Sequence, residues 1–172
     1  MRRLFWIIFG LMLVDYLAMV LWSFPHLAKA SDGLMPFDLR PLGYSLEDGR
    51  TYLAALGAAG RNYYLNVQHK LDTAFPALEA VVFVVAFRWL YRPPLRHFLA
   101  ALAVLGAAFD YLENAAVAEM LQAGSQQVTA AMVAAASRWT VLKSAAVTLA
   151  MLALLIGLAR AILQKRRAQN DG

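Results

Sequence analysis

The sequence predicts an all-α protein, a bundle of four transmembrane helices with a short extra helix in the first outer loop. Hydrophobic residues make up 61% of the 172-residue chain, against about 45–50% in soluble domains. Four apolar runs are each long enough to cross a bilayer, which takes about 20 helical residues. Basic residues gather at the ends of these runs, as they do beside membrane spans. The length fits one domain, residues 1–172.

The first predicted span covers residues 4–24 and follows two arginines. This segment also has features of a secretory signal peptide, because the sequence AKA at residues 28–30 has the form of a cleavage site. Its apolar run, however, exceeds the usual length of about 7–15 residues and contains the acid Asp15. We therefore expect a retained membrane anchor.

The outer segment, residues 25–60, changes composition and contains a short helix. Prolines and glycines mark an irregular stretch at its start. Ser45 then has the position of a helix cap, and Asp48 has the capping-box position three residues later. The apolar run that follows predicts a short interfacial helix that ends near Gly60.

Three further spans follow in the sequence. The second covers residues 63–91 and contains Pro76, which removes one helical hydrogen bond and favours a kink. The third covers residues 98–121 and the fourth covers residues 139–163. The polar stretch between them is rich in alanine, which favours an earlier start of the last helix.

The distribution of basic residues predicts the orientation of the chain. Clusters at residues 2–3, 88–96 and 165–167 all fall on one side of a four-span bundle. By the positive-inside rule, both ends are expected in the cytoplasm and the protein in the plasma (inner) membrane.

Composition also excludes several classes of chemistry. The chain has no cysteine and only three scattered histidines, so thiol chemistry and a zinc site are not expected. No phosphate loop, dinucleotide fingerprint or nucleophile elbow appears in the sequence, and we expect no metal and no cofactor. The sparse charge is unlike a nucleic-acid-binding surface.

Ionisable side chains occur inside the predicted spans, where each costs about 2.5–3.5 kcal/mol to insert and usually faces the bundle interior. Their spacing of three or four residues puts several of them on shared helix faces. These are Arg61, Tyr64, Asp72 and Glu79 on the second span; Asp110, Glu113 and Asn114 on the third; and Thr140, Lys143 and Ser144 on the fourth. We expect one internal polar pocket between these three spans, with Asp15 contributing from the first.

Roles follow from residue type. Asp72, Asp110 and Glu113 are the candidate proton donors or acceptors, and Lys143 is their counter-ion. The expected ligand contacts are Asp15, Arg61, Tyr64, Glu79, Asn114, Thr140, Lys143 and Ser144. A purely structural interpretation is that these polar groups join helices by hydrogen bonds and set their packing.

Three short patterns resemble one seen in small uncharacterised bacterial four-span membrane proteins. They are Gly60-Arg61 with Tyr64, Leu71-Asp72 with Phe75-Pro76, and Asp110-Tyr111-Leu112-Glu113-Asn114. The layout is also similar to that of the EXPERA group, which includes sterol isomerases and a sterol-binding receptor. Shared features are four spans, a long first outer segment with a short helix, a proline in the second span and buried carboxylates. That resemblance implies a pocket for a lipid-like ligand.

The sequence thus favours a membrane protein that binds a lipid-like or amphiphilic small molecule, with acid/base catalysis left open. The first alternative is a non-enzymatic accessory or assembly subunit, with a membrane-protein partner or as a homo-oligomer. The second alternative is a proton or ion path. Membrane lipids are the expected surroundings in each case.

Overall fold

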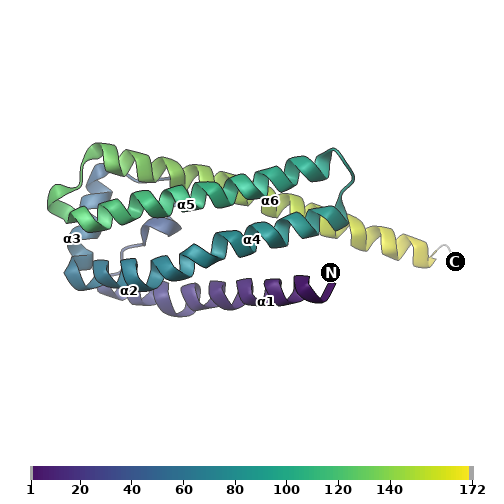
Figure 1. Cartoon of the computed structure of the whole chain (residues 1–172), viewed down its shortest axis with the longest axis horizontal. Helices are drawn as coiled ribbons and strands as arrows, with labels where there is room; N and C mark the ends of the chain where they lie inside the picture. Colours follow the sequence, from purple (N-terminus) through teal and green to yellow (C-terminus); the bar gives the residue numbers. More distant parts are fainter. Residues whose placement is uncertain (1, 171–172) are drawn as a thin grey trace.

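Residues 2–170 are described by the structure, a computed structural model, and every regular element among them is a helix. Four long helical segments run side by side, and the first begins at the same end of the bundle where the last one ends (Figure 1). The four segments are Arg2–Ala30, Leu46–Leu90, Leu95–Gln127 and Ala130–Gln169. Each is long and apolar enough to cross a membrane. The prediction of an all-α chain with four such helices is confirmed.

The first segment is one continuous helix with a wider turn in it. It consists of α1 (Arg2–Ala18), the π-helical turn η1 (Met19–Ser23) and α2 (Phe24–Ala30). It packs mainly on α4, the second part of the second long segment, and most of its surface stays exposed.

A loop with one 3₁₀ turn, η2 (Phe37–Leu39), leads from α2 to α3 (Leu46–Tyr63). The capping box predicted at the start of α3 is confirmed, because the Ser45 hydroxyl accepts from the Asp48 backbone N–H at 3.1 Å and the Asp48 carboxylate accepts from the Ser45 N–H at 2.9 Å. Hydrogen bonds from the Ser45 side chain and backbone lower the pKa of Asp48. Gly57, with φ of 62°, kinks α3, close to the expected end of the short helix.

After the kink at Gly57 the helix continues from α3 without a further break, and it therefore begins a few residues before the predicted residue 63. A second π-helical turn, η3 (Tyr64–Gln68), joins α3 to α4 (His69–Leu90). The two π turns touch, since the Gln68 amide lies 3.4 Å from the Met19 sulfur. Pro76 lies within α4, as expected.

The third and fourth helices are longer than their predicted spans. α5 (Leu95–Gln127) bends at Gly124, whose φ of 70° is one that glycine adopts readily. Only two residues separate the end of α5 from the start of α6 (Ala130–Asn170), which confirms the early start that the alanine-rich stretch favours. The two helices form the largest interface of the fold.

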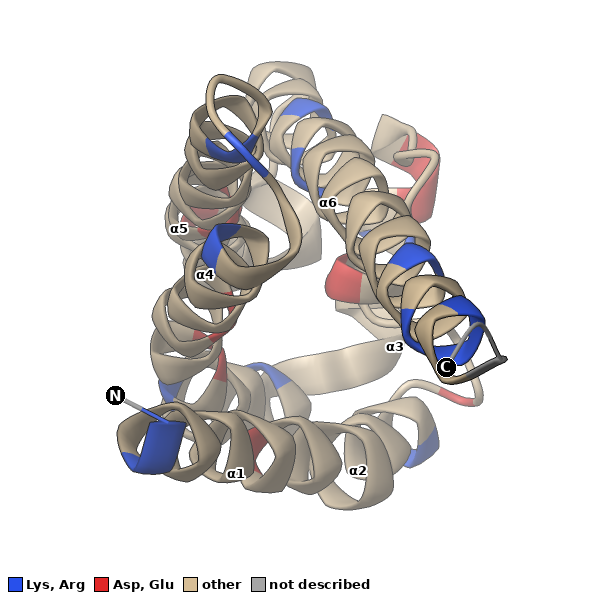
Figure 2. Cartoon of the chain, turned by 90° about the vertical axis from the view of Figure 1, so that its right-hand side faces the viewer, with Lys and Arg blue, Asp and Glu red and all other residues tan. Residues whose placement is uncertain are grey.

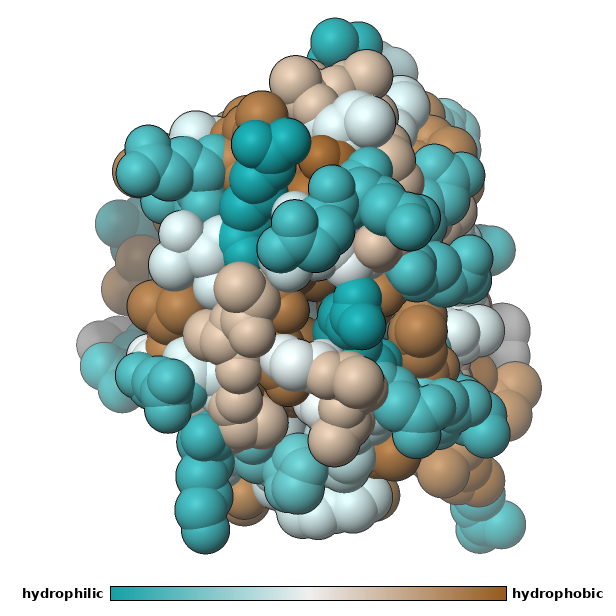
Figure 3. All heavy atoms as spheres, turned by 90° about the vertical axis from the view of Figure 1, so that its left-hand side faces the viewer, coloured by the Kyte–Doolittle hydropathy of each residue, from teal (hydrophilic) through white to brown (hydrophobic). Residues whose placement is uncertain are grey.

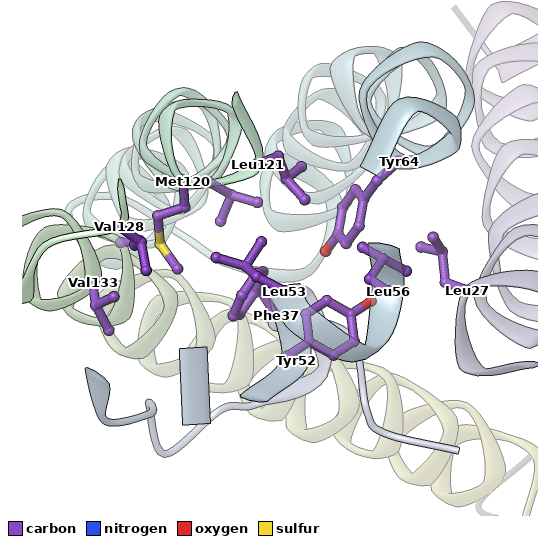
Figure 4. Close-up of a cluster of buried hydrophobic side chains, with 12 residues drawn as sticks. Leu27, Phe37, Tyr52, Leu53, Leu56, Tyr64, Met120, Leu121, Val128 and Val133 are labelled. Atoms are coloured by element: carbon purple, nitrogen blue, oxygen red, sulfur yellow. The ribbon is translucent and has the colours of Figure 1, made fainter. Parts of the chain in front are cut away.

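The main apolar core lies at the end of the bundle that carries α3, where the η2 loop and α3 pack between the other helices (Figure 4). Phe37, Tyr52 and Tyr64 are completely buried there. The Arg40 guanidinium lies 5.4–5.9 Å from the ring centres of Phe37, Tyr44 and Tyr52, within the range of cation–π attraction. The loop is therefore fixed by its own side chains.

Apolar side chains are exposed along the outer faces of the helices, especially on α1 and α6. Hydrophilic residues occupy much of the surface at the α3 end (Figure 3). Lys and Arg gather at the opposite end, on α1, on the α4–α5 turn and on the end of α6 (Figure 2). Soluble monomers rarely expose apolar surface on this scale, so an apolar environment along the sides of the bundle fits the exposed residues.

Candidate functional site

A partly open cavity of about 280 Å³ lies between the four long segments and the η2 loop. Much of its lining is apolar, with Phe24 and Phe75 among the lining side chains. The acidic residues that line it are Asp38, Asp72, Glu79 and Asp110, and Lys143 and Ser144 line it from α6. Polar groups from separate helices therefore meet at one place inside an otherwise apolar bundle.

Lys143 is the centre of an ion-pair cluster beside this cavity. Its Nζ pairs with Glu113 Oε2 and lies 3.5 Å from Asp110 Oδ1. The Thr140 hydroxyl donates to Glu113 Oε1 at 2.6 Å, and Glu113 is completely buried. A buried charge is tolerated only when it is paired and hydrogen-bonded. These contacts supply both conditions for Glu113, which stands behind the cavity wall rather than in its lining.

Asp72 differs from the other two predicted catalytic acids. It is 95% buried, with 5% of its surface exposed, and it lines the cavity. Its Oδ2 has no hydrogen-bond partner among residues 2–170. Buried polar atoms are normally paired. The free oxygen of Asp72 can therefore receive a donor from a ligand.

Asn114 compensates for a helical hydrogen bond that Pro76 removes from α4. Proline has no N–H, so the carbonyl four residues earlier, that of Asp72, lacks its helical donor. The Asn114 amide donates to this carbonyl at 3.2 Å and to Asp110 Oδ1 at 3.4 Å. His69 adds a contact between α4 and α5, with Nε2 at 2.8 Å from the Asn114 carbonyl oxygen. The amide thus closes the gap in α4 and also holds an acid of the cavity.

Asp38 is a cavity residue that the sequence pattern did not reveal. The Tyr64 hydroxyl donates to its Oδ2 at 2.8 Å, while its Oδ1 has no partner among the described residues. Phe37 beside it is fully buried and anchors the loop. Because Asp38 lies outside the regular helices, no helical spacing could have assigned it to the site.

The remaining predicted site residues divide into three groups. Glu79 and Ser144 line the cavity. Tyr64 bonds to the lining residue Asp38, whereas Thr140 bonds to Glu113 behind the cavity wall. Asp15 and Arg61 are not among its lining residues. The Arg61 guanidinium lies against Gly124, at the bend of α5, where it occupies the space that a Cβ would need.

Among residues 2–170, no group of three or more His, Cys, Asp or Glu side chains is arranged to hold a metal ion. Among the acids at the cavity, Asp110 in the lining and Glu113 behind it pair with the Lys143 ammonium group. Comparison with protein-family models, with curated proteins and with solved structures finds no match to this chain.

Proposed function

We propose that this chain is a four-span membrane protein whose acidic cavity binds the polar head of an amphiphilic small molecule with a cationic amine head. The observation that carries the proposal is the buried Asp72 carboxylate, which lines the cavity and keeps one oxygen without a partner in the described chain. The apolar part of the cavity lining would receive the hydrocarbon part of the same molecule.

Membrane insertion is supported by the four long apolar helices and by the apolar side chains on their outer faces. The gathering of basic residues at one end of the bundle supports cytoplasmic termini in a plasma (inner) membrane. In this orientation the acidic cavity faces the outer half of the bilayer, where an amphiphile dissolved in the membrane would reach it.

The charge of the cavity supports the choice of an amine. Five carboxyl groups lie in or beside it, and Lys143 is the one cationic side chain among its lining residues. The lysine pairs with Glu113 and Asp110, which leaves the carboxylates of Asp72 and Asp38 for a ligand. An ammonium head would supply both the charge and the hydrogen-bond donors that these oxygens lack.

Acid/base catalysis is a second function at the same site, and the free oxygen of Asp72 is the observation that favours it. A general acid or base must lie within hydrogen-bond reach of the proton that it transfers. Asp110 and Glu113 are held by Lys143. Asp72 is therefore the candidate proton donor or acceptor, with the other two acids as positioning residues.

The test uses the whole protein in mild detergent. The three probes have alkyl groups of equal length and differ only in the head, which is an amine, an alcohol or a carboxylate. We expect the amine to bind most tightly in a calorimetric titration and Asp72→Asn to weaken it by at least about tenfold, because the charge partner is lost. Glu119→Gln, an exposed acid on α5, is the matched control and should bind as the parent does.

Equal binding of the three probes, or unchanged binding by Asp72→Asn, would reject the proposal. A membrane protein that co-purifies in equal amount, together with no amine binding, would instead favour the accessory-subunit alternative. Asp72 is a sharper test than Glu113, because removing Glu113 leaves the buried Lys143 ammonium without its nearest partner.

A further inference from the structure

Two adjoining hollows lie at the basic end of the bundle. Arg88 is 16 residues from Asp72 along the chain, about 24 Å along a helix, so these hollows are separate from the acidic cavity. The first has a volume of about 350 Å³ between α1 and α4 and includes Arg88 and Arg96. The second has a volume of about 530 Å³ beside α6 and includes Arg92 and Arg160. Trp89 lines both.

Within residues 2–170, acidic side chains are missing from the segments that form this end of the bundle. Residues 1–14, 80–109 and 144–170 contain no Asp or Glu. Within the described part of the chain, both ion pairs belong to Lys143, and no carboxylate pairs with an arginine of either hollow. These guanidinium groups therefore have no carboxylate partner within residues 2–170, Arg96 having only a hydrogen bond of 3.3 Å from its Nε to His97 Nε2. An anion would supply the missing negative charge.

The hollow between α1 and α4 has an apolar body and a basic end. Its apolar lining consists of Leu4, Phe5 and Ile8 from α1 and Val81 and Val85 from α4. Val81, Val85 and Arg88 recur at four and three residues, which places them on one face of α4. The Phe5 ring packs on Trp89 with ring centres 4.6 Å apart. An apolar groove that ends at arginines matches a molecule with a hydrocarbon chain and an anionic head.

We infer that this end of the bundle binds an anionic phospholipid, with one acyl chain in the groove between α1 and α4 and the phosphate at Arg88 and Arg96. Guanidinium groups bind phosphate oxygens through paired hydrogen bonds, and basic pockets between membrane helices suit anionic headgroups. The inference rests on the proposed membrane insertion but not on the proposed ligand of the acidic cavity. A free phosphate ion would leave the apolar groove unfilled, which is why a lipid is the occupant that fits.

Trp89 supplies a direct readout, because it lines the groove and is 53% exposed. In the full chain, the other three tryptophans are replaced by phenylalanine, which leaves Trp89 as the only indole. The protein is reconstituted in vesicles that contain phosphatidylglycerol or phosphatidylcholine with brominated acyl chains, at equal mole fraction. Bromine quenches indole fluorescence on contact. We expect stronger quenching of Trp89 by brominated phosphatidylglycerol than by brominated phosphatidylcholine.

The double variant Arg88→Gln/Arg96→Gln should remove this preference, with a loss of about fivefold in relative lipid affinity for each arginine. Arg166→Gln/Arg167→Gln removes the same charge from the exposed end of α6, outside both hollows, and should keep the preference. Equal quenching by the two lipids, or an equal loss in both double variants, would overturn the inference. Flotation of the vesicles checks insertion separately, because a chain that does not float with them contradicts membrane insertion itself.

Discussion

Replacing Asn114 by alanine removes the donor that pairs with the carbonyl freed by Pro76. Two hydrogen bonds are lost, one to the Asp72 carbonyl at 3.2 Å and one to Asp110 Oδ1 at 3.4 Å. Both are long. The first joins α5 to α4, and hydrogen bonds between membrane helices contribute about 0.6–2 kcal/mol each; the second lies within α5. We expect the free energy of unfolding to fall by about 1–2 kcal/mol.

A double-mutant cycle with Pro76→Ala isolates the carbonyl contact. Alanine at residue 76 restores the backbone N–H that can donate to the Asp72 carbonyl. In that background the Asn114 amide is no longer needed there, and Asn114→Ala should cost about 1 kcal/mol less than it does beside proline. The coupling thus tests the role assigned to Asn114 rather than the general effect of shortening a buried side chain.

The assay is reversible unfolding by titration with a denaturing detergent in mixed micelles, applied to the parent, the two single variants and the double variant. Asn66→Ala is the matched control, because this exposed amide bonds only within its own helical segment, to the Asn62 carbonyl at 2.9 Å and to the Asn62 side chain. Asn66→Ala should lower the free energy of unfolding by the same amount with or without Pro76. If Asn114→Ala lowers the free energy of unfolding equally with proline and with alanine at residue 76, the explanation based on the freed carbonyl is wrong.

Three further predictions follow from hydrogen bonds of the described chain. Thr140→Val should lower the free energy of unfolding by about 1.5–3 kcal/mol, since Glu113 loses a charge-assisted bond of 2.6 Å, whereas Thr140→Ser should keep most of it in the same detergent titration. Tyr64→Phe should speed hydrogen exchange in residues 34–44 and leave exchange in α6 unchanged, because Asp38 loses its donor; equal effects on both would contradict this. The lowered pKa of Asp48 stabilises the folded state above the unfolded-state pKa of about 3.9, and this contribution is lost as pH falls from there through the folded-state pKa. Asp48→Asn should abolish that part of the pH dependence in unfolding curves recorded across the range.

Much of the site could be predicted because it lies on helices. Helical spacing assigns side chains three and four residues apart to one face. In the structure the Asn114 amide accordingly bonds both to Asp110, four residues away, and to the Asp72 carbonyl of α4. Embedded charges also need partners, and this requirement predicts that Lys143 lies next to acids. Helical spacing and the need of embedded charges for partners were together enough for these residues.

Two kinds of information were missing from the sequence. Placement within a span does not give the rotation of that helix, and Asp15 lies within the first span without lining the cavity. The fold of an irregular loop depends on long-range contacts, such as the hydrogen bond of 2.9 Å from the Tyr44 backbone N–H to the Ser137 hydroxyl. This contact helps to fix the loop that carries Asp38, and no local sequence pattern predicts it.

Because η3 is a π turn, the effect of deleting a residue near the cavity depends on where the deletion is made. Tyr64 and Asp72 are eight residues apart, and in a regular α-helix at about 100° per residue they would point about 80° apart. The wider turn advances less per residue and brings both side chains round towards Asp38. A chain shortened by one residue within η3 could therefore revert to ordinary helical winding and keep the same alignment. One shortened by a residue within α4, between Asp72 and Glu79, would turn those two acids away from each other.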